Sequence, residues 1–408
     1  MAAPDISETE HSLIERAVQR LLEECPPRTT PAVEFLHAQF DAGLAYVWFP
    51  PGHGGIGLSI GEQAWIDRVL AAQGAPPSGR VTNPIAAGQG AASIVAYGSE
   101  DQKRRYLRPL FAGEIYGCQL YSEPGSGSDL ASLGTRAVRD GDDWVVNGQK
   151  VWTSGGHLAD FGILLARTDP EVAKHAGLTQ FVVDMHAPGV EVRPLRQMTG
   201  GAEFNEVWLT DVRVPDAERL GDVNDGWRVS QHTLVFERYN MPAVSGRGEG
   251  PIANAVAAWN ARADKTSPGA LALRAELMRH WVETEVLRLL QMRAGVMRAQ
   301  GSSGPEGSLG KLAVSKVNRS LAEWAPALLG PGGMAMEGGY AQVADADAKG
   351  ASLRRSDRLA MACVGSPSSS IAGGTDQIQR NIIGDRVLGL PREPAADKGI
   401  PWSKTLRS

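Results

Sequence analysis

Two stretches of the sequence carry groups that could move a proton. In the first, residues 370–380 place two glycines and a threonine before apolar residues at helical spacing, which predicts a glycine turn ahead of a helix. Such a turn offers backbone N–H groups to an electron-rich atom, but it holds no acid or base. In the second, Glu237 follows an apolar triplet in a helix predicted from Gly226. A glutamate in apolar surroundings has a raised pKa and can serve as a general base, although most helix glutamates face water.

Two other stretches suit a cofactor. Residues 121–135 form a loop rich in glycine and serine, whose N–H and hydroxyl donors fit a pyrophosphate or a flavin ring. An ordinary surface loop rich in turn formers is the alternative. Trp152, Thr153 and Ser154 stand at a predicted strand end before two glycines. A tryptophan face beside a hydroxyl can shield a flavin, but a tryptophan in a β-domain core explains the same residues.

The elements that must position these residues follow one another in three blocks. Residues 1–118 are mainly helical, with an amphipathic helix from Ser7 to Glu24 and a capping box from Ser99 to Gln102. Residues 119–222 are rich in short β-branched or aromatic runs, and residues 223–408 return to helical periodicity. This order predicts an α+β fold with helical domains on either side of a β domain.

Within the β block, two residue pairs carry the sequence signal of a hairpin turn. They are Asp140-Gly141 and Asn147-Gly148, each flanked by β-branched or aromatic residues. We therefore predict a turn at both pairs.

The composition excludes several classes of protein. The net charge of −5 provides no basic field for nucleic acid or an anionic membrane, and no apolar run approaches the length of a membrane span. The cysteines Cys25, Cys118 and Cys363 lie far apart without CxxC spacing, so neither a disulfide framework nor a zinc site is expected. We expect a cytoplasmic protein that binds neither nucleic acid nor membrane and holds no metal.

Taken in order, four segments resemble the acyl-CoA dehydrogenase family of flavoproteins. They are GSEDQKRRYLRPLFAG at 98–113, SEPGSGSD at 122–129, NGQKVWTSGG at 147–156 and GGTDQIQRNIIGDRVLGLPRE at 373–393. The resemblance spans nearly the whole chain. It implies a helical N-terminal domain, a central β-barrel-like domain and a C-terminal four-helix bundle. It also implies FAD and the α,β-dehydrogenation of an acyl-CoA to a trans-2-enoyl-CoA.

The resemblance also implies which residues hold the cofactor. Near the flavin and its phosphates it places Gln119, Tyr121, Ser122, Gly127 and Ser128, with Trp152 and Thr153 beside the ring and Ser154 donating near N5; Thr375 and Gln377 lie near the adenine-side phosphates or ribose.

The catalytic base is implied by one branch of the family. In the best-known branches a glutamate stands directly before the Gly-Thr pair, and here that position is Gly373. In the branch that includes isovaleryl-CoA and long-chain enzymes, the base stands eleven residues after the glycine that begins the first bundle helix, and an arginine follows it. Counting from Gly226 reaches Glu237, followed by Arg238 in a substrate-binding position. The N–H of Gly373 is then expected to donate to the thioester oxygen.

Two family motifs that contact the FAD of a neighbouring subunit are missing. The region at 258–273 has no R-x-x-F-G, and Ala327 replaces the glutamine of Q-x-x-G-G. These losses resemble bacterial enzymes, some of them heteromeric, that act on CoA esters of steroid side chains or ring fragments. A homodimer, a homotetramer or a heterotetramer with a related subunit is expected, with an electron-transfer flavoprotein as electron acceptor. The alternatives are a flavin oxidase or monooxygenase on this fold, and a flavin-binding subunit with little activity of its own.

Overall fold

The computed structural model describes residues 8–199, 201–239, 246–299, 306–334, 359, 362–392 and 394–405. Its contacts divide the chain into two compact units, and the first comprises residues 1–195, 203–240 and 394–408. The second comprises residues 196–202 and 241–393. The domain boundaries predicted after residues 118 and 222 stay predictions.

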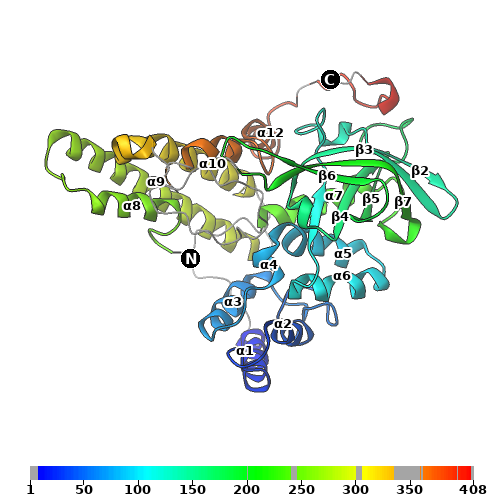
Figure 1. Ribbon diagram of the computed structural model, residues 1–408, viewed down its shortest axis with the longest axis horizontal. Helices are drawn as coiled ribbons and strands as arrows, with labels where there is room; N and C mark the ends of the chain where they lie inside the picture. The colour runs from blue at the N-terminus through cyan, green and yellow to red at the C-terminus, as the bar shows by residue number, and fades with distance from the viewer. Residues whose placement is uncertain are drawn as a thin grey trace. The chain divides into compact units, whose positions relative to one another are not determined.

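The first unit begins with helices, as the sequence predicted (Figure 1). They are α1 (Glu8–Glu24), α2 (Ala32–Asp41), α3 (Gln63–Ala72), α4 (Gly79–Thr82), α5 (Ala91–Tyr97) and α6 (Glu100–Ala112), and a π-helical segment, Pro84–Gly90, precedes α5. The predicted capping box is confirmed, because Ser99 and Gln102 exchange both of its hydrogen bonds at the start of α6. In α1, Ile14, Val18 and Leu21 are buried at helical spacing.

A sheet of eight strands follows in the first unit. The strands are β1 (Gly117–Leu120), β2 (Arg136–Asp140), β3 (Asp143–Ser154), β4 (Phe161–Arg167), β5 (Leu178–Asp184), β6 (Val190–Leu195), β7 (Phe204–Pro215) and β8 (Arg219–Leu220). Their order is β6-β7-β3-β2-β4-β5-β8, and β1 pairs in parallel with β4. Strand β4 is buried along its whole length, which explains its uninterrupted apolar sequence. The helix α7 (Gly226–Tyr239) packs against β5 and α5.

One predicted hairpin turn is confirmed and the other is wrong. Asp140-Gly141 begins the tight turn between β2 and β3, and Gly141 has a φ of +64°. Asn147-Gly148 instead lies inside β3, where the register with β7 shifts. The side chain of Asn147 exchanges two 2.9 Å hydrogen bonds with Asp211 on β7, so the amide stabilises a bulge rather than a turn.

The second unit is mainly helical in its described part. It contains α8 (Pro251–Ala261), α9 (Pro268–Ala299), α10 (Glu306–Leu329) and α12 (Asp376–Arg386). Figure 1 shows α8, α9 and α10 beside one another, and α10 contacts α8, α9 and α12. Their core includes Ile252, Trp259, Leu277 and Leu321. The predicted α+β class, with a sheet-containing part between two helical parts, is confirmed.

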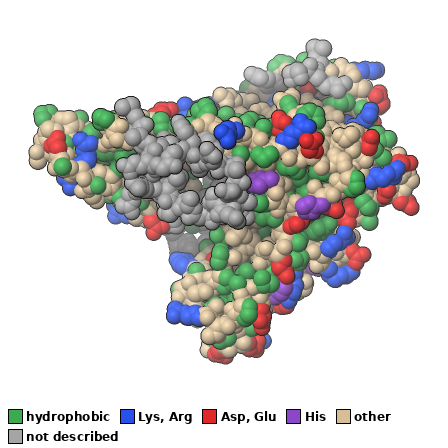
Figure 2. Space-filling model, in the orientation of Figure 1, with side chains coloured by type: hydrophobic (Ala, Val, Ile, Leu, Met, Phe, Trp, Pro, Cys, Tyr) green, Lys and Arg blue, Asp and Glu red, His purple; other side chains and the backbone are tan. Residues whose placement is uncertain are grey.

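The surface agrees with the composition. On the face shown in Figure 2, lysine and arginine side chains alternate with aspartate and glutamate rather than forming one basic field. Among the described helices, none is both long and apolar enough to cross a membrane.

Candidate active site

The sheet brings two of the predicted cofactor stretches together. After β1, the chain passes through Tyr121 and Ser122, and the N–H of Val151 on β3 donates to the carbonyl oxygen of Ser122 over 2.9 Å. The ammonium of Lys150 donates to the carbonyl oxygen of Tyr121 over 3.1 Å. The segment that begins at Gln119 therefore lies beside the end of β3, which carries Trp152, Thr153 and Ser154.

A buried ion pair fixes this junction. Lys150 is fully buried, and its ammonium contacts the carboxylate of Glu123 at 2.8 Å and the carbonyl oxygen of Leu165 at 2.8 Å. Glu123 also accepts the N–H groups of Gly134 at 2.7 Å and Thr135 at 2.9 Å. The glutamate thus joins both ends of the loop 123–135 to the sheet.

The buried environment shifts the pKa values of both Glu123 and Lys150. Burial alone would raise the pKa of Glu123, but the Lys150 ammonium and the N–H groups that donate to the carboxylate outweigh it and lower that pKa. Burial lowers the pKa of Lys150, and the Glu123 carboxylate offsets only part of this effect. Glu123 is therefore held as a carboxylate at neutral pH and is suited to structure rather than to proton transfer.

The middle of the loop 123–135 presents small donors to solvent. Gly127 and Ser128 are exposed, and a Cβ atom built on Gly127 would meet no heavy atom within 4 Å. Ser126 beside them is 3% exposed, and its hydroxyl donates to the carbonyl oxygen of Asp129 over 2.6 Å. Ser126 is held by this hydrogen bond, while Gly127 and Ser128 next to it remain exposed. A phosphate or a ring therefore has room to approach the backbone of these two residues.

Trp152 has the geometry of a ligand-facing residue. It lies where the β3–β7 register shifts between Lys150 and Thr153, has a φ of +61°, and its side chain is 60% exposed. A bulky residue in this left-handed conformation is an outlier that concentrates at functional sites. Here the bulge turns the indole outward, although the pattern of β3 also allowed a core position for it.

The hydroxyls beside Trp152 differ in their surroundings. Thr153 is 1% exposed, and within the described part of the chain its buried Oγ1 atom has no hydrogen-bond partner. Ser154 is half-buried. An exposed indole, an unpaired buried hydroxyl and an open glycine loop fit a flavin with its phosphates, because they offer a flat apolar surface together with hydrogen-bond donors.

The hydroxyl of Tyr121 points to α7. It donates to Oγ1 of Thr233 over 3.2 Å, and that atom also hydrogen-bonds to the hydroxyl of Ser93 on α5. All three residues are buried. This hydroxyl cluster joins α5, the end of β1 and α7. Sequence reasoning missed Thr233 and Ser93; the available signal was a hydroxyl residue among the apolar positions of a helix.

The proposed base stands one helical turn further along α7. Glu237 and Arg238 belong to this helix, but their side chains lie outside the described residues. The described contacts of Tyr121 and Thr233 nevertheless fix the path of the preceding turn.

In the second unit, the glycine turn is confirmed. Gly373 and Gly374 have φ values of +66° and +84°, which favour glycine, and Thr375 caps α12 by accepting the N–H of Ile378 over 3.2 Å. The buried amide of Gln379 donates to the carbonyl oxygens of Gly373 and Gly374 over 3.3 and 3.4 Å. Because the C=O and N–H of a trans peptide point in opposite directions, this contact directs the following N–H groups away from α12.

The first residue of α12, Asp376, also contacts two side chains of α10. Lys311, which is 3% exposed, contacts the carboxylate of Asp376 at 3.1 Å, and Ser315 donates to that carboxylate over 3.1 Å. Gln377, the next residue, is exposed.

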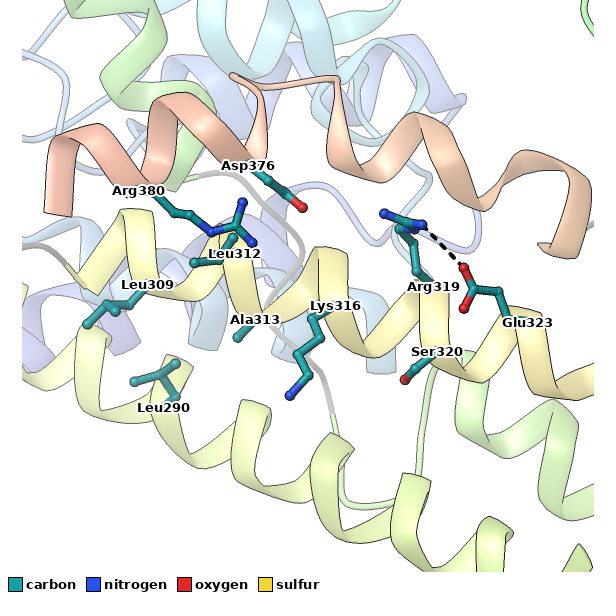
Figure 3. A pocket seen from close by; sticks show the side chains of 10 residues that line it. All are labelled: Leu290, Leu309, Leu312, Ala313, Lys316, Arg319, Ser320, Glu323, Asp376 and Arg380. Carbon is teal, nitrogen blue, oxygen red and sulfur yellow. Dashed lines mark hydrogen bonds and ion pairs between the residues drawn. The ribbon is translucent and has the colours of Figure 1, made fainter. Parts of the chain in front are cut away.

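A cavity of about 560 Å³ opens along α9, α10 and α12 (Figure 3). Leucines form part of its wall, and charged side chains of both signs line it, with Arg319 paired to Glu323 at 3.3 Å.

Family comparisons cover almost the entire sequence. Models of the N-terminal, middle and C-terminal domains of acyl-CoA dehydrogenase match residues 5–114, 118–212 and 224–388. The acyl-CoA dehydrogenase IpdE1 of Mycobacterium tuberculosis is 36% identical over 357 residues, which is 86% of each chain. The acyl-CoA dehydrogenase FadE34 of the same organism is also 36% identical, but the match spans 45% of its length.

Solved structures agree with this result. The Tcur3481-Tcur3483 steroid ACAD has a TM-score of 0.71 and 27% identity, covering 94% of this chain and 98% of that one. The ChsE4-ChsE5 complex from M. tuberculosis has a TM-score of 0.69 and 27% identity, covering 96% and 100%. Together, the domain matches and the relatives support FAD-dependent dehydrogenation of an acyl-CoA. The chain belongs to the acyl-CoA dehydrogenase family.

Proposed function

We propose that this chain dehydrogenates an acyl-CoA with Glu237 as the base that removes the α-proton. The observation that carries the proposal is the hydroxyl cluster of Ser93, Tyr121 and Thr233, which fixes α7 one turn before Glu237. A continuous helix places residues four apart on the same side, so the base and the cluster share a face of α7. Glycine at position 373 leaves the site without the alternative base.

The glycine turn supplies the second part of the chemistry. We assign the N–H of Gly373 to the thioester oxygen, where a hydrogen bond stabilises negative charge that develops as the α-proton leaves. Arg238 is assigned to the substrate. The resemblance places Gly373 next to the substrate, and because glycine has no side chain, we propose that this position admits a bulky or α-branched acyl group.

The residues assigned to FAD are those with free donors or an exposed ring. In the first unit, four of these residues are solvent-accessible: Gly127, Ser128, Trp152 and Ser154. The hydroxyl of Tyr121 already donates to Thr233. We therefore assign the contribution of Tyr121 to FAD binding to its backbone, between Gln119 and Ser122. Thr153 contributes its unpaired hydroxyl. Thr375 and Gln377 are assigned to the adenine-side phosphates or ribose. These residues would hold FAD, which when bound would supply the acceptor for the β-hydride.

The test is an anaerobic titration of the purified protein with short, branched and steroid-derived acyl-CoAs, followed by flavin absorbance. The wild type should bleach with its substrate class. Glu237→Gln should retain the flavin spectrum but lose at least about 10²-fold in the bleaching rate, because the base is gone. Asp216→Asn, at a carboxylate that contacts Trp144 and Arg219, serves as the control and should bleach normally. Near-wild-type bleaching by Glu237→Gln would sink the assignment.

For the partners, we propose a heteromer with a related chain and an electron-transfer flavoprotein as acceptor. The missing R-x-x-F-G motif and Ala327 remove two contacts that the resemblance places across subunits, and the similar ChsE4-ChsE5 structure is a complex of two chains. A mass measurement and the flavin content of the chain purified alone test this. A flavin-loaded homo-oligomer that turns over substrate would refute the requirement for a second chain.

A further inference from the structure

The chain after α12 returns to the first unit. Residues 394–405 belong to that unit, and they end in a short 3-10 turn at Trp402–Lys404. The backbone N–H of Trp402 donates to the carbonyl oxygen of Val172 over 2.8 Å, and that of Ser403 donates to Pro170 over 2.8 Å. The tail 394–405 is thus hydrogen-bonded to the connection between β4 and β5.

The side chain of Trp402 reaches the loop 123–135. It is 7% exposed, and its indole N–H donates to the carbonyl oxygen of Ser132 over 3.1 Å. A Cβ atom on Gly134 would lie 3.9 Å from the indole, so the ring packs closely against the loop backbone. One tryptophan of the tail therefore contacts the end of the loop that follows Gly127 and Ser128.

A buried arginine lies between Trp402 and the loop. Arg167 is 1% exposed, and its guanidinium lies 4.7 Å from the centroid of the Trp402 ring. The guanidinium also donates to the carbonyl oxygens of Ala131, Leu133 and Lys174. A cation over an indole is attracted more strongly when both are removed from water. Arg167 therefore couples the tail ring to the backbone of the loop.

A lysine makes a second connection. The ammonium of Lys174 contacts Asp129 of the loop at 2.8 Å and Asp397 of the tail at 2.5 Å. Asp129 follows Ser128 directly, and its carboxylate also accepts the hydroxyl of Ser132 over 2.5 Å. Lys174 therefore links Asp397 of the tail to Asp129, the residue that follows the exposed Ser128 of the loop.

We propose that the tail 394–405 is a positioning segment that holds the loop 123–135 in the conformation that binds FAD. The inference rests on the proposed function, in which Gly127 and Ser128 contact the cofactor. A loop of glycine and serine has little conformational preference of its own, and ordering it on binding would weaken the affinity. The contacts of Trp402, Arg167 and Lys174 fix the loop before FAD arrives.

The experiment compares Trp402→Ala with Trp402→Phe in the full chain. The first readout is the dissociation constant of FAD from the apoprotein, measured by flavin fluorescence. The second is the rate at which thermolysin, a protease that cleaves beside large apolar residues, cuts within residues 123–135 of the apoprotein, identified by mass spectrometry. Trp402→Ala should raise the FAD dissociation constant at least about tenfold and speed cleavage, since the tail releases the loop. Trp402→Phe keeps a ring over Arg167 and should fall between Trp402→Ala and the wild type.

Trp144→Ala is the matched control. Trp144 on β3 is another buried tryptophan of the first unit, with a 2.8 Å hydrogen bond from its indole to Asp216 and an arginine 5.7 Å from its ring. Its loss should destabilise the protein but leave the FAD dissociation constant of the folded protein unchanged. If Trp402→Ala does not fold, Asp397→Asn tests the Lys174 connection with the same two readouts.

Each outcome decides one part of the inference. Weaker FAD binding together with faster cleavage supports the positioning role. A folded Trp402→Ala protein with unchanged cleavage overturns it, because the tail then does not hold the loop. Faster cleavage with unchanged FAD affinity also overturns it, and this outcome places the fault in the proposed cofactor role of Gly127 and Ser128.

Discussion

Replacing Lys150 with methionine should destabilise the first unit strongly. Methionine has a similar length and fills the volume, so the substitution removes the charge and three hydrogen bonds without leaving a large cavity. The carbonyl oxygens of Tyr121 and Leu165 lose their donor, and the carboxylate of Glu123, whose side chain is only 11% exposed, loses its cation.

The expected loss is large because one charge stays behind. Removing one partner of a buried ion pair costs about 3–5 kcal/mol, and both carbonyl oxygens also lose the hydrogen bond from Lys150. The N–H groups of Gly134 and Thr135 still stabilise Glu123 and limit the loss. In the double variant Lys150→Met with Glu123→Gln, no buried charge is left unpaired. The double variant should therefore be more stable than Lys150→Met alone.

Urea-induced unfolding followed by circular dichroism measures these differences. Arg193→Met is the control, because the Arg193–Glu191 pair on the sheet is more than half exposed and its loss should leave the unfolding midpoint unchanged. The reasoning is refuted if Lys150→Met lies within about 1 kcal/mol of the wild type, or if the double variant is less stable than the single one.

Four further predictions follow from the site. Because Lys150 and nearby donors lower the pKa of Glu123, ionised Glu123 stabilises the folded protein fully above the unfolded pKa of about 4.3. This contribution to the free energy of unfolding is lost as the pH falls through the lower folded pKa. Glu123→Gln should therefore flatten the acid side of a plot of unfolding free energy against pH. Thr233→Val should lower the turnover number with flavin content unchanged, whereas Thr233→Ser should restore it; equal rates for the two variants would argue against the hydroxyl cluster. Trp152→Ala should weaken FAD binding and shift stability by no more than about 0.5 kcal/mol, since the side chain is exposed, and a large drop in melting temperature would instead indicate a core role. Gly148→Ala should cost about 1–3 kcal/mol in chemical denaturation, because the new Cβ atom would lie 2.7 Å from Cα of Thr135; a neutral effect would contradict this packing.

Several features could be predicted because their signals are local. The capping box of Ser99 and Gln102, the turn at Asp140-Gly141 and the glycine turn before α12 each depend on residues within a few positions of one another. Local chemistry also misled at Asn147-Gly148, where the same residue types stabilise a bulge through Asp211 on a distant strand. A hairpin signal therefore predicts a local bend, and strand pairing decides how that bend is used.

The sequence by itself determined the order of helical and strand-rich parts, and it singled out the candidate cofactor stretches and the proposed base Glu237, because periodicity and motif spacing are written along the chain. Only the tertiary structure decided which groups meet. Lys150 reaches Glu123 across 27 positions, Tyr121 reaches Thr233 across 112, and Trp402 reaches Ser132 across 270. Such contacts depend on strand pairing and burial, which bring remote residues together and make their charges and hydroxyls interact strongly away from water.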